Sequence, residues 1–208
     1  MGRRIDYYFS LGSPWAYLGH APFVEIARKH GAAVNYKPVF LTRVFAETGG
    51  LPLVKRHPVR QRYRLLELQR WRERREVPLN LAPKHVPFDV SLADRFVLAI
   101  LVGNGDPDPF MRRAFEAVWV EDRNLGDREV LAEVAREAGL EPEPLMQLAD
   151  GTLTEAVYLL NQENAVAADV FGSPAYTLEG EVFWGQDRLE FLDQALASGR
   201  PPYRPVVS

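Results

Sequence analysis

The sequence predicts an α/β protein whose strands lie near the two ends of the chain and whose middle is helical. Three patterns support this prediction: an opening strand–helix–strand unit, a long central region with helical periodicity, and a closing hairpin followed by a helix. The 208 residues, of which 47% are hydrophobic, carry a formal net charge of -3. This length and composition suit one large globular domain, or a domain with a sizeable insertion.

The opening unit begins with a buried strand at residues 5–10, which are rich in aromatic side chains and are bounded by Gly12. Pro14 suits the first position of a helix, and an apolar stripe extends that helix to about Gly31. The run AVNYKPVFL predicts a second strand. The two strands should be parallel, because a crossover helix returns the chain to the same edge.

The central region predicts five helices, at residues 59–75, 91–103, 109–122, 127–138 and 151–168. The chain then closes with two short strands around the turn at residues 179–180 and a helix that starts near Gln186. A βαβ half, a helical insertion and a ββα half make a thioredoxin-like fold with a large all-helical insertion. Residues 1–44 and 170–208 would form the thioredoxin-like domain, and residues 45–169 the inserted helical subdomain.

No cysteine occurs in the chain, which excludes disulfides, thiolate metal sites and a cysteine nucleophile. The N-terminal MGRRIDYYFSLGS lacks the apolar stretch of roughly 7–15 residues that a secretory signal needs. No later run approaches the roughly 18 apolar residues of a membrane span. These features predict a cytoplasmic protein that does not enter a membrane.

Two motifs carry a resemblance to a known family: YYFSLGSPWAYLG near the start and VFGSPAYTLEGEVFWGQDRLEFL near the end. Their order and separation resemble the 2-hydroxychromene-2-carboxylate isomerase family, which is close to the kappa-class glutathione transferases and the DsbA-like proteins. The match spans nearly the whole chain. The resemblance implies a DsbA-like thioredoxin fold, the use of glutathione or another low-molecular-mass thiol, and a homodimer.

Ser13 is the candidate catalytic residue, because it lies at the corner between the first strand and the first helix. The free N–H groups and the dipole of a helix N-terminus favour an anion at such a corner. The resemblance implies that this anion is the thiolate of bound glutathione and that the Ser13 hydroxyl donates to its sulfur. The residues alone leave open the alternative that Ser13 only caps the helix.

The second motif places Ser173 before Pro174. The resemblance implies that a cis proline here faces the Ser13 corner, and that Ser173 offers its backbone to glutathione as a neighbouring strand would. A generic Ser-Pro pair is more often an ordinary trans turn. Further along, Asp187 and Arg188 begin the final helix, where an acidic residue is favourable for dipole reasons alone. The resemblance adds that Arg188 holds the γ-glutamyl carboxylate and that Asp187 pairs with the ammonium group.

The basic stretch VKRHPVRQRYRLLELQRWRERR predicts a solvated helix face opposite an apolar face formed by Tyr63, Leu66 and Trp71. A nucleic-acid interface is the alternative, but the chain is acidic overall and no nucleic acid is expected. The resemblance brings Lys55, Arg60 and Arg62 near the site, where they suit the carboxylates of glutathione or of an anionic substrate. Family members often have asparagine where Gly50 aligns, which leaves one polar contact open.

Histidines and acidic residues give no metal-site pattern in this sequence. Four histidines lack ligand spacing and are expected on the surface or at helix ends: His20, His30, His57 and His85. Asp108 is expected only to cap the helix before Pro109.

The residues and the resemblance together predict a glutathione-dependent isomerase of an aromatic ring-cleavage intermediate, by reversible thiolate addition. The implied substrate is the aromatic carboxylate 2-hydroxychromene-2-carboxylate, in an apolar slot lined by Trp15, Phe40 and Trp184 together with Arg62. Two alternatives remain: a kappa-like glutathione transferase, and a non-catalytic DsbA-like binding or chaperone module. Disulfide exchange is excluded, because it requires a thiol from the protein.

Overall fold

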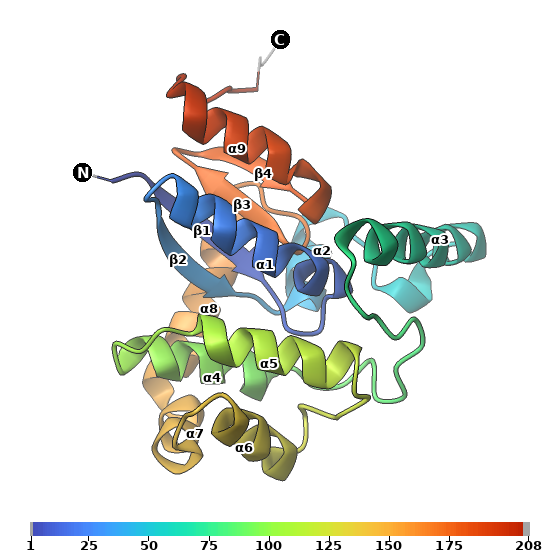
Figure 1. Ribbon diagram of the computed structural model, residues 1–208, viewed down its shortest axis with the longest axis vertical. Coiled ribbons are helices and arrows are strands. Elements are labelled where there is room, and N and C mark those ends of the chain that lie inside the picture. The colour runs from blue at the N-terminus through green and yellow to red at the C-terminus, as the bar shows by residue number, and fades with distance from the viewer. Residues whose placement is uncertain (1, 206–208) are drawn as a thin grey trace.

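The computed structural model describes residues 2–205 and contains one four-stranded sheet of order β2-β1-β3-β4 (Figure 1). The strands are β1 (Arg4–Phe9), β2 (Ala33–Pro38), β3 (Ala175–Leu178) and β4 (Glu181–Trp184). The β1–β2 pair is parallel, and the β1–β3 and β3–β4 pairs are antiparallel. The two ends of the chain therefore share one sheet, which confirms the thioredoxin-like α/β fold with a helical insertion.

Side chains that alternate along the strands bury two different faces of the sheet. Tyr7 and Tyr176 belong to the larger core, which packs under α1 (Pro14–Lys29) and α9 (Leu189–Ser198). Tyr8 belongs to a smaller cluster on the other face. In Figure 1, α1 and α9 cross the front of the sheet, and the carboxyl end of β1 leads directly into the start of α1.

Between β2 and β3 the chain is helical. Its helices are α2 (Leu41–Thr48), α3 (Pro58–Arg75), α4 (Ser91–Val102), α5 (Asp108–Trp119), α6 (Arg128–Glu137), α7 (Pro142–Asp150) and α8 (Thr152–Ala167), with a 3₁₀ turn, η1, at Leu53–Lys55. The five expected helices are confirmed. The short helices α2 and α7 were not expected: α2 follows a run interpreted as strand, and two prolines obscure α7, although Pro142 suits its first turn. The expected boundary at residue 45 divides α2, so we propose to count α2 with the insertion.

The expected apolar face of α3 is confirmed at Trp71, which packs against the core, and is wrong at its other two positions. Leu68 is the side chain that α3 buries, whereas Tyr63 is 56% exposed and Leu66 is 49% exposed. Side chains of the inserted helices α4, α5, α6 and α7 belong to the same hydrophobic core as the sheet. In addition, the indole N–H of Trp119 on α5 donates to the carbonyl of Leu11 at 3.3 Å. Helices α4 and α5 thus support the turn that leads into α1. Within residues 2–205 no helix is both long and apolar enough to cross a membrane.

Candidate active site

Ser13 caps α1 and at the same time contacts the second motif. Its side-chain oxygen accepts a hydrogen bond from the backbone N–H of Ala16 at 3.3 Å, as an N-cap does. The same hydroxyl donates to the backbone carbonyl of Ser173 at 3.2 Å. Ser13 is only 4% exposed. The capping alternative is therefore correct as far as it goes, but this cap also joins two segments that lie 160 residues apart.

The Ser173–Pro174 bond is cis and lies against the Ser13 corner, as expected. The Ser173 hydroxyl accepts a hydrogen bond from the backbone N–H of Ser10 at 3.2 Å. Two hydrogen bonds thus hold the segment before β3 against the turn between β1 and α1. This brings the two short sequence motifs together at one point of the fold.

A cavity of about 670 Å³ opens at this corner, bounded by α2, α3 and the segment that follows β4. Seven of the eleven candidate site residues line it: Ser13, Trp15, Arg60, Ser173, Trp184, Asp187 and Arg188. Pro174 is buried directly behind Ser173. Lys55, Arg62 and Phe40 are not among the lining residues, although all three are exposed.

Two glycines shape the aromatic part of this cavity. A Cβ on Gly172 would lie 2.3 Å from Nε1 of Trp184, so the glycine lets the indole approach the backbone beside the corner. The Trp184 ring also packs on Phe171, with ring centroids 4.6 Å apart. A Cβ on Gly50 would lie 2.4 Å from the ring of Phe45, which lines the cavity. An asparagine at Gly50 would therefore have to displace Phe45.

Asp187 and Arg188 lie in a 3₁₀ turn, η2 (Gln186–Arg188), and the α-helix itself begins only at Leu189. Gly185, with φ +101°, allows the chain to turn from β4 into η2. Arg188 Nη1 lies 2.6 Å from Asp187 Oδ2, so the two proposed ligand-binding side chains are paired with each other. The turn is anchored by Arg75, whose guanidinium donates to the backbone carbonyl of Gln186 at 3.0 Å and to its side-chain oxygen at 2.9 Å.

Three arginines line the α3 side of the cavity at intervals of four residues: Arg56, Arg60 and Arg64. Burial and the neighbouring Arg60 lower the pKa of Arg56, and burial and the neighbouring Arg56 lower the pKa of Arg64. The two carboxylates in the lining, Glu67 and Asp187, are paired with other arginines, Arg70 and Arg188. This wall is therefore strongly cationic. Arg56 and Arg64 were not predicted from the sequence. Arg64 follows Arg60 by one helical turn, whereas Arg56 precedes α3 in extended backbone.

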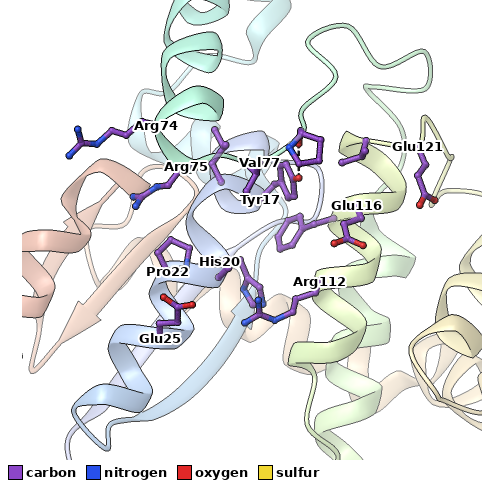
Figure 2. Close-up of a pocket in the computed structure, with 15 residues that line it drawn as sticks. Tyr17, His20, Pro22, Glu25, Arg74, Arg75, Val77, Arg112, Glu116 and Glu121 are labelled. Carbon is purple, nitrogen blue, oxygen red and sulfur yellow. Dashed lines mark hydrogen bonds between the residues drawn. The ribbon is translucent and has the colours of Figure 1, made fainter.

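Figure 2 shows a second cavity, of about 560 Å³, on the other side of α1 between α3 and α5. Here the expectations for His20 and Asp108 are wrong. His20 is 1% exposed, and its Nε2 lies 2.8 Å from the Asp108 carboxylate, which also accepts a hydrogen bond from Arg112 at 2.9 Å. The three side chains bridge α1 and α5. By contrast, His57 caps α3 and His30 ends α1, as expected.

The DSBA-like thioredoxin domain model matches residues 4–197. The chain belongs to this family. It is 26% identical to a 2-hydroxychromene-2-carboxylate isomerase of Sphingobium xenophagum, over 94% of this chain and 99% of that protein. It is 23% identical to glutathione S-transferase kappa 1 of Caenorhabditis elegans, over 95% of this chain and 92% of that protein.

A solved structure of 2-hydroxychromene-2-carboxylate isomerase aligns with this chain at a TM-score of 0.75, with 24% identity, covering 94% of this chain and 95% of that one. The likeness therefore extends through both the thioredoxin-like part and the inserted helices. In this member of the DSBA-like family no residue is cysteine, so its corner cannot exchange disulfides with a thiol of its own. A thiol at this corner has to come from a bound molecule.

Proposed function

We propose that the chain is an isomerase that uses a bound thiol, glutathione or a close analogue, to isomerise an aromatic ring-cleavage intermediate of the 2-hydroxychromene-2-carboxylate type. The observation that carries this proposal is the Ser13 hydroxyl, held 3.2 Å from the Ser173 carbonyl beside a cavity in a chain without cysteine. The names of its relatives support both parts of the proposal: isomerase in one case and glutathione transferase in the other.

The proposed reaction needs only an activated sulfur and an electron sink. The cyclic hemiketal first opens to its phenol and α-keto acid. The thiolate then adds to the carbon–carbon double bond conjugated with that keto group, and the electron pair moves into the keto group to form an enolate. The former double bond is then a single bond and rotates. Collapse of the enolate re-forms the double bond and expels the thiolate, so the thiol is regenerated. The backbone N–H of Trp15, the dipole of α1 and the Ser13 hydroxyl stabilise the thiolate. Pro14 has no N–H, and the N–H groups of Ser13 and Ala16 donate to Ser10 and to the Ser13 side chain.

Thiol binding in this proposal uses the two motifs as a pair. The backbone of Ser173 pairs with the cysteinyl part of glutathione as a neighbouring strand would, with Pro174 fixing the bend behind it. Asp187 binds the ammonium group of the γ-glutamyl arm, and Arg188 binds its carboxylate. For this, the ion pair between Asp187 and Arg188 has to break or to accept the ligand's two charged groups as additional partners. The Ser13 proton turns from the Ser173 carbonyl to the sulfur.

The proposed substrate contacts differ from those expected from the sequence. Trp15 and Trp184 remain as apolar walls, because both line the cavity. We transfer the carboxylate contacts from Lys55 and Arg62 to Arg56 and Arg64, which line the cavity with Arg60. A planar guanidinium matches a carboxylate with two parallel hydrogen bonds, which favours an arginine cluster for an anionic substrate. Phe40 keeps no proposed contact.

Isomerisation should depend on thiol without consuming it. We expect turnover of 2-hydroxychromene-2-carboxylate to rise with glutathione and saturate, while the free thiol concentration stays constant. A kappa-like transferase, supported by the relative from Caenorhabditis elegans, would instead consume thiol with 1-chloro-2,4-dinitrobenzene. A binding or chaperone module would bind without either reaction. Stoichiometric thiol loss, or no thiol-dependent turnover, would contradict the proposed isomerase.

The arginine wall should govern substrate affinity. We expect Arg60→Gln and Arg64→Gln each to raise the substrate KM about tenfold or more, because a charge-assisted bond contributes roughly 1.5–3 kcal/mol. Arg62→Gln is the matched control, since it removes the same charge from the same helix at a position outside the cavity lining. Steady-state kinetics at saturating thiol measure the effect. Equal KM changes in all three variants would mean that the substrate responds to the overall positive charge of α3 and does not contact Arg60 and Arg64 specifically.

We further propose that the chain works in the cytoplasm, where low-molecular-mass thiols are kept reduced, and that it forms a homodimer. Exposed apolar side chains support the dimer. Two of them, Leu51 and Val54, lie between α2 and α3 and outside the cavity lining.

A further inference from the structure

Asp94 is a fully buried carboxylate directly behind the Ser13 corner, and the proposed function does not use it. It lies on α4 with no exposed surface. Its Oδ1 accepts a hydrogen bond from the backbone N–H of Leu11 at 3.0 Å. Its Oδ2 accepts hydrogen bonds from the Ser10 hydroxyl at 3.2 Å and from the Tyr158 hydroxyl of α8 at 3.0 Å. All three donors are neutral groups.

One residue, Ser10, connects Asp94 to the candidate active site. The Ser10 hydroxyl, which donates to Asp94, accepts from the backbone N–H of Gly12 at 3.4 Å. The Ser10 carbonyl accepts from the backbone N–H of Ser13 at 3.0 Å. The backbone N–H of Ser10 donates to the Ser173 hydroxyl at 3.2 Å. Asp94 thus holds the turn that places Ser13 and the start of α1 against Ser173.

Among residues 2–205, no cationic side chain forms an ion pair with this carboxylate or donates a hydrogen bond to it. Burial raises the pKa of Asp94 to about 7, although its three hydrogen bonds act in the opposite direction. The nearby charge of Asp89 raises the pKa of Asp94 further. Arg95, the next residue of α4, acts on Tyr158 instead, where it partly counters the rise in the pKa of the tyrosine. A buried carboxylate without a cationic partner is costly, so its position at a reactive corner points to a role there.

We propose that Asp94 is a positioning residue for the thiol site: it holds the turn before Ser13, and its negative charge opposes the formation of a thiolate bound at Ser13. This inference rests on the proposed function, because it needs a thiol bound at that corner. Two negative charges in a poorly solvated region raise each other's pKa, and the coupling is reciprocal. Below neutral pH, Asp94 is protonated and the bound thiol ionises more easily. Above it, the charged Asp94 holds part of the thiol in its neutral form.

Asp94→Asn is the direct test, because asparagine has the same shape and carries no charge. Its side-chain oxygen still accepts from Leu11, whereas its amide N–H groups donate to the hydroxyl oxygens of Ser10 and Tyr158, which reverses the direction of those two hydrogen bonds. We expect the bound glutathione of this variant to carry three- to tenfold more thiolate between pH 7 and 8 than that of the wild-type protein. The measurement is the ultraviolet absorbance of the bound thiolate against pH.

Tyr158→Phe gives a second test that keeps the carboxylate. It removes a hydrogen bond that favours the charged form of Asp94, so the part of the thiol titration that depends on Asp94 should move to higher pH. Glu155→Gln, an exposed charge change on the same helix, should leave the curve unchanged.

A merely structural Asp94 would alter stability but leave the thiol pKa unchanged. Curves for Asp94→Asn and Tyr158→Phe that superimpose on the wild-type curve would overturn this inference alone. Absence of any bound thiolate in the wild-type protein would overturn the proposed function as well.

Discussion

Replacing Ser13 with alanine is expected to lower turnover ten- to a hundredfold near neutral pH while leaving the fold intact. The variant loses the hydroxyl that would donate to the bound sulfur, and a bond to a charged group contributes roughly 1.5–3 kcal/mol. That energy corresponds to a rise of about one to two units in the pKa of the bound thiol. Thiol affinity should change less, because the N–H groups of α1 and the backbone of Ser173 remain.

The Ser13 hydroxyl also caps α1, so Ser13→Ala should cost about 1 kcal/mol of unfolding free energy. Asp127→Ala is the matched control, because Asp127 caps α6 through the backbone N–H of Glu129 at 2.9 Å and lies outside the cavity lining. We expect both variants to lose similar stability but only Ser13→Ala to lose turnover. Thiolate titration curves that are the same for Ser13→Ala and the wild type would leave Ser13 as a helix cap only.

Ser13→Cys places a protein thiol where the borrowed thiol is proposed to bind. We expect this variant to form a mixed disulfide with oxidised glutathione and to lose isomerase turnover. Mass spectrometry of the intact protein would detect the adduct. If the Ser13→Cys protein bound glutathione normally and turned over substrate at the wild-type rate, the proposed position of the sulfur would be wrong.

Replacing Gly19 with alanine is expected to weaken thiol binding about tenfold, although the residue lies outside the cavity lining. A Cβ on Gly19 would lie 2.6 Å from the Cβ of Gln186 and 3.4 Å from its Cα. These atoms belong to the backbone region of η2, which Arg75 holds in place. The turn that carries Asp187 must therefore move, and small displacements of binding groups are costly.

Two opposing effects decide the stability of Gly19→Ala. Alanine gains about 1 kcal/mol in a helix interior, and overpacking costs about 1–3 kcal/mol. The variant should therefore unfold with up to about 2 kcal/mol less free energy than the wild type. Gly103→Ala is the control, because its new Cβ would meet its nearest atoms at 3.5 Å and 3.6 Å, which are ordinary contact distances. Calorimetric titration with glutathione measures the affinity of the Gly19→Ala variant. An unchanged dissociation constant would mean that the position of η2 does not affect thiol binding.

Local patterns in the sequence were sufficient for the elements whose signals are short-range. The β1–α1 corner, the closing hairpin and the long helices follow from periodicity, capping and turn residues, which neighbouring residues determine by themselves. Ser13 stood out because it lies at a strand-to-helix corner, whereas the role of Ser173 was implied by the family resemblance. The helices α2 and α7 were missed because an eight-residue helix and a proline-rich helix leave little periodic signal.

Contacts between distant segments required the tertiary structure. The buried pair of His20 and Asp108 exists only because α1 packs on α5, and Asp94 reaches Leu11 only because α4 supports the turn after β1.

The basic stretch shows most clearly what local sequence patterns determine and what only the tertiary structure decides. Its composition predicted a charged helix, but Arg60 lines the cavity and Arg62 does not. Successive residues of a helix are rotated by about 100°, so a shift of one or two positions moves a side chain to another face. The packing of α3, set by the burial of Leu68, decides which arginines line the cavity, and that packing depends on residues far away in the chain.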